Sequence, residues 1–326
     1  DAILAYDDVK LKQHLDMLNI NVTMSQGGWY DRKLAEAGQK NVGHGPIVGG
    51  PIYADYRQRL RAACEKLRRL RPGIKCLIYY DCWLVSGADI ATHYADSLYT
   101  RADGRPRNYQ PRTEFGFPIA NVVPTLENTM GRETLEQIPA MILDEIGADG
   151  LYWDEMEGVG YGSPLITYNA WDGYSCDLDP KTYTITRECG INTIMGEAHR
   201  IAVIKRVREL GGDMMGNGPT ATRDILALKP QRMIEIQHNE YWHYEGNLDS
   251  PLGYGSSPMG FDNWIRALKM ATLIVGTRYT YTHEISPHVF PFTPIELHAG
   301  YLLGKERIIT LHDGNYGWPG DKSLVQ

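Results

Sequence analysis

Hydrophobic positions along the chain follow two spacings. Short runs rich in β-branched and aromatic residues have the period of a strand, and longer stretches with apolar positions three to four residues apart have the period of a helix. The strand-like runs fall at residues 20–24, 75–81, 120–125, 150–155, 213–217, 232–238, 278–283 and 307–313. Helical patterns precede nearly all of these runs, at residues 10–19, 56–73, 132–150, 192–212, 222–230, 261–276 and 293–306.

Strands that alternate with helices of this length predict a parallel sheet. Eight such units close on themselves in the (β/α)8 or TIM barrel, which takes about 250 residues plus insertions. We therefore predict a single α/β domain over residues 1–326, with a long insertion around residues 82–118. A doubly wound open sheet is the structural alternative, but it usually has fewer units and a glycine-rich first turn, which this sequence lacks.

A barrel places its chemistry at the carboxyl ends of its strands. Carboxylates, imidazoles and large aromatic rings gather at those predicted ends, whereas the opposite ends are poorer in them. They are Trp29 after the first strand; Tyr80, Asp81 and Trp83 after the second; Asp154, Glu155 and Glu157 after the fourth; Asn217 at the fifth; His238, Glu240 and Trp242 after the sixth; His283 and Glu284 after the seventh; and His312 at the eighth.

The aromatic composition favours a carbohydrate as the ligand. The chain has 21 Tyr and 7 Trp but only 5 Phe, so it prefers rings that combine an apolar face with a hydrogen-bonding group. Glycoside hydrolysis needs two carboxyl groups across the scissile bond, about 5–5.5 Å apart for retention or 6.5–9.5 Å for inversion. Asp154 or Glu155 on one side and Glu240 or Glu284 on the other are the candidate pair. In this interpretation the rim tryptophans and Tyr80 stack on sugar rings, while Asp81, Glu157, Asn217 and the histidines bind hydroxyl groups.

The segment "GADGLYWDE" at residues 147–155 resembles the GxDGxxxD element at the fourth strand of many barrel glycoside hydrolases. It is similar to the α-glucosidase and α-galactosidase clan and to the endo-α-N-acetylgalactosaminidase-like families. In those relatives the closing Asp is the nucleophile, which implies Asp154 here. Their acid/base lies at a later strand end, commonly the sixth, which implies Glu240 or Glu235. The segment "TRADGRPRNY" at residues 100–109 also resembles a hairpin that many such enzymes carry before strand three.

A second clan gives a different pair. Retaining β-glycosidases carry a Glu acid/base at strand four and a Glu nucleophile at strand seven, which correspond to Glu155 and Glu284. That clan usually has Asn before its strand-four Glu, whereas this chain has Asp154. We therefore favour catalysis centred on Asp154. The alternatives of another class are a non-catalytic carbohydrate-binding or scaffold barrel, and a metal-dependent barrel hydrolase or lyase with His283 among the ligands.

Several classes of function are disfavoured. The net charge of −7 argues against a nucleic-acid partner, which needs a basic face. The sequence contains no apolar run of about 18 residues, so no membrane span is predicted. The first predicted strand lacks the HxH of metal-dependent barrels, and neither GxxxxGK[ST] nor GxGxxG after a strand occurs, so no metal or cofactor is predicted. Five cysteines without CxxC spacing argue against a zinc site, with a disulfide between Cys176 and Cys189 left open. A polysaccharide substrate favours a secreted or periplasmic location, and the oligomeric state cannot be read from the sequence.

Overall fold

The fold was analysed in a computed structural model of the 326-residue chain. The structure describes residues 2–17, 20–26, 41–42, 51–86, 90–110, 119–156, 159–160, 163–217, 222–236, 252–255, 273–277 and 307–312. None of the helices in these ranges combines the length and the apolarity needed to cross a bilayer.

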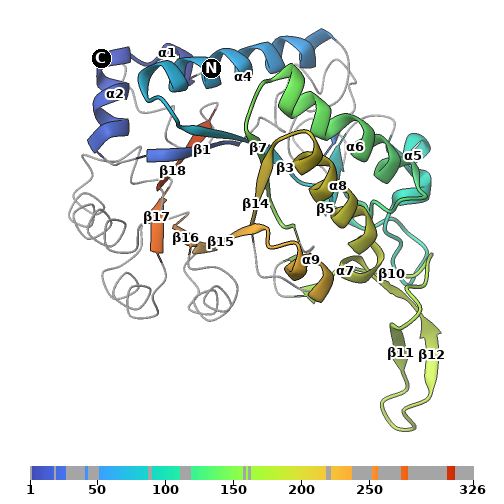
Figure 1. The fold of residues 1–326 in the computed structure, drawn as a ribbon. Coiled ribbons are helices and arrows are strands. Elements are labelled where there is room, and N and C mark those ends of the chain that lie inside the picture. Colours follow the sequence, from blue (N-terminus) through green and yellow to red (C-terminus); the bar gives the residue numbers. More distant parts are fainter. Residues whose placement is uncertain are drawn as a thin grey trace.

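The described strands build one eight-stranded sheet, one four-stranded antiparallel sheet and three antiparallel pairs. The strands of the large sheet are β1 (Ile20–Gln26), β3 (Lys75–Tyr80), β7 (Gly150–Trp153), β14 (Asp213–Asn217), β15 (Gln231–Ile236), β16 (Leu252–Gly255), β17 (Leu273–Thr277) and β18 (Arg307–His312). Their pairings are parallel, and their order in space follows the chain, with β18 beside β1. Cα atoms of β17 and β18 also come within 8 Å of each other. Figure 1 shows the eight strands arranged around a common centre.

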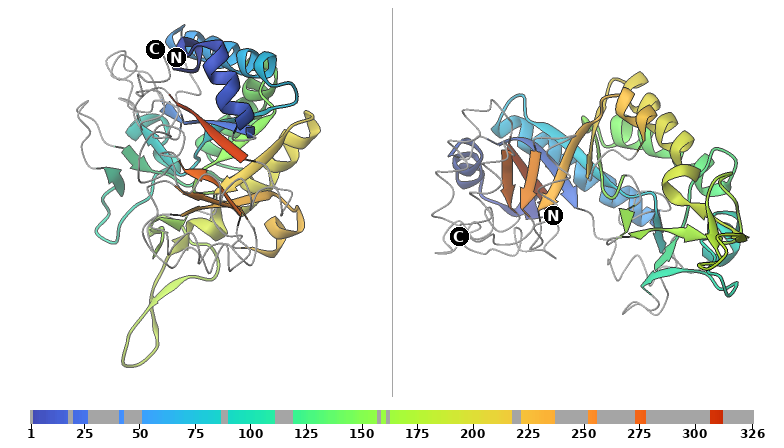
Figure 2. Two further views of the ribbon diagram at one scale, coloured as in Figure 1. Left: turned by 90° about the vertical axis from the view of Figure 1, so that its left-hand side faces the viewer. Right: turned by 90° about the horizontal axis from the view of Figure 1, so that it is seen from below.

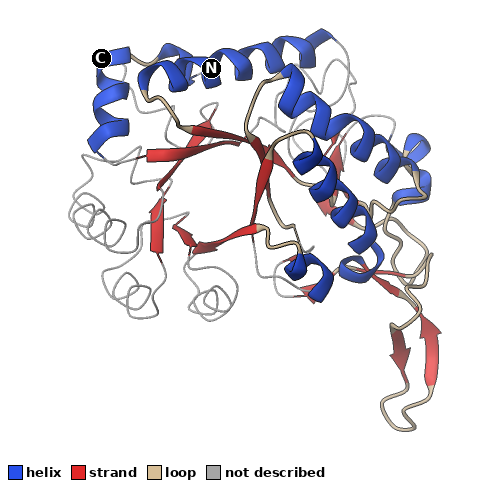
Figure 3. Ribbon diagram, in the orientation of Figure 1, coloured by secondary structure: helices blue, strands red, loops and turns tan. Residues whose placement is uncertain are grey.

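Helices precede the first five of these strands, where the hydrophobic pattern predicts them. They are α2 (Asp8–Met17) before β1, α4 (Pro51–Leu70) before β3, α6 (Thr129–Ala140) with the π-helical turn η2 (Met141–Glu145) before β7, α8 (Glu197–Glu209) before β14, and α9 (Arg223–Ala227) before β15. They lie on the outer side of the curved sheet (Figure 3). The alternation of helix and parallel strand is therefore confirmed over this part of the chain. The predicted helix 293–306, and residues 261–272 of the one predicted before it, lie outside the described part of the chain.

The main hydrophobic core lies between the strands and this helical layer. Leu67 of α4, Ile138 of α6 and Val203 of α8 pack there in one cluster with Leu151 and Trp153 of β7. The neighbouring residue Tyr152 points to the other face of the sheet and is not part of that cluster, because successive side chains of a strand alternate between faces. This alternation decides which residues at the strand ends point away from the helical layer.

The prediction that residues 120–125 form the third strand of the barrel is wrong. Strand β6 (Ile119–Asn121) belongs to a separate antiparallel sheet with β2 (Asn41–Val42), β4 (Leu84–Ser86) and β5 (Asn108–Gln110). Strand β7 instead pairs directly with β3, so the predicted fourth strand is the third of the large sheet. A parallel neighbour of β3 needs a crossover connection, whereas β6 returns antiparallel to β4, which begins four residues after β3 ends. Hydrophobic periodicity detects a buried strand but does not say which sheet it joins.

The C-terminal half contains two further differences. Strand β16 lies in a segment where no strand is predicted, and β17 lies largely within the predicted helix 261–276. The run around β17 reads "TLIVGT", and a short apolar run of this kind fits both a buried strand and one turn of a buried helix. The predicted strand at residues 278–283 falls outside the described part of the chain.

The connection between β7 and α7 (Asn192–Met195) is long and contains three small antiparallel pairs. They are β8 (Val159–Gly160) with β9 (Ser163–Pro164), β10 (Ile166–Thr167) with β13 (Gly190–Ile191), and β11 (Cys176–Leu178) with β12 (Ile185–Glu188). The last pair forms a hairpin that projects from the body of the molecule (Figures 1 and 2). Arg187 fixes its base by donating to the carbonyl of Ala102 at 2.8 Å and by lying over the ring of Tyr168. The structure has Cys176 and Cys189, which flank this hairpin, as free thiols.

Candidate active site

The site forms where β3, β7 and β14 end side by side. Tyr79 and Tyr80 of β3 lie in register with Tyr152 and Trp153 of β7. The ladder continues for one residue beyond β7, because the backbone N–H of Asp154 donates to the carbonyl of Tyr80 at 2.8 Å. Asp154 is therefore held at a fixed height at the carboxyl end of the sheet, although it lies in the first turn after the strand.

Gly150 explains why the segment "GADG" introduces this strand. It pairs with Asp213 of β14, and a Cβ atom added at position 150 would lie 1.7 Å from the Asp213 carbonyl oxygen. Only a residue without a side chain allows the two backbones to approach this closely. The close approach brings the end of β14, where Asn217 lies, next to the end of β7.

Side chains from all three strands donate hydrogen bonds to the carboxylate of Asp154. Its Oδ2 accepts from the hydroxyl of Tyr79 at 2.7 Å, and its Oδ1 accepts from Nδ2 of Asn217 at 2.7 Å. The Oδ1 atom also accepts from the backbone N–H of Glu155 at 3.1 Å and from the hydroxyl of Tyr152 at 3.4 Å. Each contact comes from a donor, so the group is oriented as a carboxylate acceptor. The sequence-based expectation that Asp154 and Asn217 meet at one rim agrees with this geometry.

The sequence analysis does not single out Tyr79, because its place beside Asp154 follows from the register between β3 and β7 together with strand alternation. Residues 79, 152 and 154 lie on the same face, because Tyr79 is in register with Tyr152 and Tyr152 is two residues before Asp154. Burial, followed by the negative charge of Asp154, raises the pKa of Tyr79 well above its usual value. The phenol therefore keeps its proton and remains a donor to Asp154 at neutral pH.

Tyr80 and Trp83 are placed differently from what the sequence analysis expected. Both side chains are 0% exposed, so neither ring offers a free face to a sugar in this structure. Tyr80 packs against Trp153 on the helical side of the sheet, with ring centroids 4.9 Å apart. Trp83 lies with its ring centroid 5.3 Å from the guanidinium of Arg200. Their apolar surface contributes to the core, as large buried rings do.

Asp81 is a further carboxyl group near the carboxyl end of the large sheet, and its side chain is fully buried. Its Oδ1 accepts the backbone N–H of Trp83 at 2.8 Å, so it fixes the turn that follows β3. Burial raises the pKa of Asp81 well above its usual value, and the nearby charges of Glu155 and Asp154 raise it further. Because burial in an apolar environment disfavours the charged form, this carboxyl group favours its protonated state, beside a carboxylate that accepts hydrogen bonds.

Glu155 has a strained backbone. Its φ angle is +47°, in the left-handed region that costs an L-residue about 1–2 kcal/mol. Its carbonyl accepts the indole N–H of Trp83 at 2.6 Å, and its own N–H points to Asp154. Strain of this kind persists only where the surroundings impose it, and it concentrates at functional sites.

Most of the other predicted site residues lie outside the described part of the chain. These are Trp29, Glu157, His238, Glu240, Trp242, His283 and Glu284. His312 ends β18 opposite Gln26 of β1, at the carboxyl end of the sheet. At the carboxyl end of the sheet, the described residues therefore include Asp154, its donors and Asp81. The predicted partner acids Glu240 and Glu284 lie outside the described part of the chain. Among the described residues, no group of three or more His, Cys, Asp or Glu side chains is arranged to hold a metal ion.

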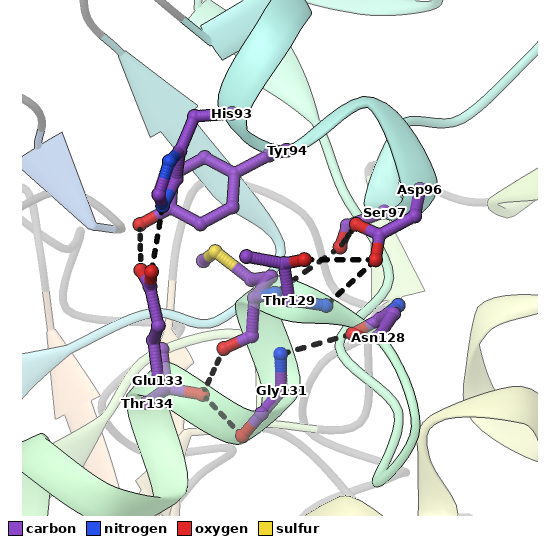
Figure 4. Close-up of polar contacts among 10 residues, drawn as sticks. His93, Tyr94, Asp96, Ser97, Asn128, Thr129, Gly131, Glu133 and Thr134 are labelled. Carbon is purple, nitrogen blue, oxygen red and sulfur yellow. Dashed lines mark hydrogen bonds and ion pairs between the residues drawn. The ribbon is translucent and has the colours of Figure 1, made fainter.

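A second polar cluster supports the insertion rather than the site (Figure 4). Glu133 of α6 accepts from the hydroxyl of Tyr94 at 2.8 Å and lies 2.6 Å from Nε2 of His93. Asp96 accepts both the backbone N–H and the hydroxyl of Thr129 at 2.9 Å, and Asn128 caps the start of α6. These contacts fasten the short helices α5 (Ile90–His93) and η1 (Ala95–Ser97) to the start of α6.

Comparison with known proteins gives distant likenesses in structure. No protein-family model matches the chain, and no curated protein matches it. The chain is similar to a noncanonic maltogenic alpha-amylase from Thermotoga neapolitana, with 9% identity and a TM-score of 0.36, over 94% of this chain and 63% of that chain. It is also similar to an amylomaltase from Streptococcus agalactiae, with 12% identity and a TM-score of 0.37, over 82% of this chain and 57% of that chain. The chain thus spans less than two thirds of either enzyme. At TM-scores this low, the site's own residues, rather than these two enzymes, must indicate the function.

Proposed function

We propose that the chain is a glycoside hydrolase in which the eight parallel strands close into a (β/α)8 barrel and Asp154 is the catalytic carboxylate. The observation that carries the proposal is the carboxylate of Asp154 at the carboxyl end of the sheet, held by Tyr79 and Asn217 at 2.7 Å each. A glycosidase needs an oriented, negatively charged carboxylate at this end of the strands to stabilise an oxocarbenium-like transition state or to attack the anomeric carbon.

The proposed mechanism divides the work between two acids. Asp154 acts as the nucleophile or as the charge stabiliser, and Glu240 is the proposed general acid that protonates the leaving oxygen and then activates water. Tyr79 and Asn217 position the Asp154 carboxylate, which lowers the cost of reorganising the site during the reaction. In the second version of the proposal, Glu155 and Glu284 form the pair and Asp154 supports Glu155. The substrate in both versions is an oligo- or polysaccharide.

The strained backbone of Glu155 favours an enzyme over a non-catalytic carbohydrate-binding barrel. A binding surface that only stacks on sugars does not require a left-handed Glu next to a carboxylate with hydrogen-bond donors on both oxygens. The side chains of Tyr80 and Trp83, which a binding surface would expose, are buried instead.

The test is activity against a polysaccharide panel, with NMR detection of the first anomer released, for wild type and Asp154→Asn. The asparagine keeps the size of the side chain and removes its charge. We expect a loss of at least about a thousandfold in turnover, within the range for losing a catalytic acid or base, in a protein that still folds. Glu240→Gln and Glu284→Gln, assayed in parallel, decide between the two proposed pairs. Turnover by Asp154→Asn at the wild-type rate would overturn the proposal.

A further inference from the structure

A buried side chain connects the turn after β3 to the turn after β7. The backbone N–H of Trp83 is fixed by Asp81, and its carbonyl accepts the N–H of Val122 at 2.9 Å. The indole N–H then spans the gap to the other turn and donates to the carbonyl of Glu155 at 2.6 Å. Trp83 is thus tied to the body of the molecule at its backbone and to the catalytic turn at the tip of its side chain.

The surroundings of the Trp83 ring restrict its movement. The side chain is 0% exposed, and the guanidinium of Arg200 lies 5.3 Å from its ring centroid. On the side of α8, a Cβ atom added at Gly196 would lie 2.7 Å from Cη2 of Trp83, so the ring packs directly against the backbone there. A ring packed this tightly gives its N–H a fixed direction.

The hydrogen bond acts on a residue whose conformation needs support. Glu155 has φ = +47°, and its N–H donates to Oδ1 of Asp154. If the Glu155 peptide relaxed toward an ordinary backbone conformation, this N–H would turn away from the carboxylate. The indole bond to the Glu155 carbonyl opposes that rotation, because it anchors the C-terminal side of the same residue.

We infer that Trp83 is a positioning residue for the reaction at Asp154: its indole holds Glu155 in the left-handed conformation that directs the Glu155 N–H onto the Asp154 carboxylate. The inference rests on the proposed function, and it assigns Trp83 a role behind the site instead of contact with the sugar. Asp81 belongs to the same chain of contacts, which runs from the Asp81 carboxyl group through Trp83 and Glu155 to Asp154.

The first test compares Trp83→Phe with Trp153→Phe. Both tryptophans are 0% exposed, and Trp153 lies in β7 immediately before Asp154, so both changes remove similar buried surface. Only the first removes the donor to Glu155. We expect Trp83→Phe to lower kcat roughly ten- to a hundredfold, the scale set by a small misplacement of a catalytic group, with KM within about twofold. Trp153→Phe is expected to keep the wild-type kcat, although it too lowers the thermal midpoint. Equal losses of kcat in both variants, or none in Trp83→Phe, would overturn the inference.

Two further measurements keep the test decisive. Site-specific replacement of Trp83 by benzothienylalanine keeps the bicyclic shape and removes only the N–H, which covers the case in which Trp83→Phe does not fold. The carboxyl 13C signal of Asp154, identified by its absence in Asp154→Asn, reports on Asp154 without any substrate. We expect this signal to move in the benzothienylalanine protein and to stay in place in Trp153→Phe. An unmoved signal contradicts the inference even if the enzyme is active, and a moved signal supports it even if the proposed sugar chemistry fails.

Discussion

The hydroxyl of Tyr79 and the carboxylate of Asp154 lie 2.7 Å apart across two neighbouring parallel strands, with Tyr79 as the donor. The pair is set by the register of β3 and β7 and not by a mobile loop, because both side chains point from the same face of the sheet. In the proposed mechanism, a donor fixed in this way orients the carboxylate before substrate arrives.

Tyr79→Phe removes this donor and leaves the ring. A hydrogen bond to a charged group contributes about 1.5–3 kcal/mol, so we expect kcat/KM to fall roughly ten- to a hundredfold. The matched control is Tyr80→Phe, which changes the next residue on the opposite face, where the ring packs against Trp153. Steady-state kinetics of both variants check the prediction. Loss of activity in Tyr80→Phe with normal activity in Tyr79→Phe would contradict this prediction and would favour the sugar-binding role that the sequence pattern predicts for Tyr80.

Asn217→Asp places a second carboxylate about where the amide now donates to Asp154 at 2.7 Å. Two carboxyl groups this close cannot both ionise easily, so the pair keeps a proton to higher pH than the single carboxyl group of the wild type does. We expect the acidic limb of the kcat/KM profile to move upward by at least about one pH unit. Asn217→Ala removes the donor without adding charge and is expected to lower the rate while leaving that limb closer to its wild-type position. Identical pH profiles for wild type and Asn217→Asp would show that Asn217 does not contact the reacting carboxylate.

His199 makes the fold sensitive to acid. It is buried in α8 with its Nε2 2.9 Å from the hydroxyl of Thr134. Burial, followed by the positive charge of Arg200, lowers its pKa from 6.5 to about 3. Between pH 6.5 and pH 3 the unfolded chain binds a proton on His199 and the folded chain does not. The contribution of the neutral imidazole to the free energy of unfolding is therefore complete above pH 6.5 and is lost progressively as the pH falls toward 3.

Urea unfolding at pH 7 and pH 4.5 tests this effect. The interval of two pH units below 6.5 corresponds to about 2–3 kcal/mol in the free energy of unfolding. His199→Gln cannot titrate, so it is expected to lose that much less stability than wild type between the two pH values, although it starts from a lower value at pH 7. Parallel losses in the two proteins would mean that other groups cause the acid sensitivity.

The sequence predicts the part of the site that depends on strand alternation and strand ends. The apolar run before Asp154 and the run before Asn217 are short, bounded by glycine or polar residues and preceded by helices, so their ends could be located and both residues placed at one rim. Tyr79 was missed because its identification needs the register between β3 and β7, which no periodicity within a single strand contains.

The remaining differences have a similar cause. Residues 119–121 form a buried strand, as the pattern indicates, but the choice between the parallel sheet and the antiparallel sheet depends on long-range pairing with β4. Trp83 follows a strand end and is therefore predicted as a rim aromatic. Its burial, however, depends on Gly196 immediately before α8 and on Arg200 of α8, more than a hundred residues later in the chain. Contacts between distant segments are not contained in local patterns of hydrophobicity.

The attachment of Asp154 to three adjacent strands also links its proposed catalytic role to the cooperativity of unfolding. A catalytic residue on a peripheral loop loses its geometry in local openings that leave the rest of the protein folded. Asp154 receives its hydrogen bonds from β3 and β14 and extends the ladder of β7, so disturbing it requires separating these central strands. In a denaturant titration, the environment of Asp154 is therefore expected to change together with the tertiary structure of the sheet and not before it.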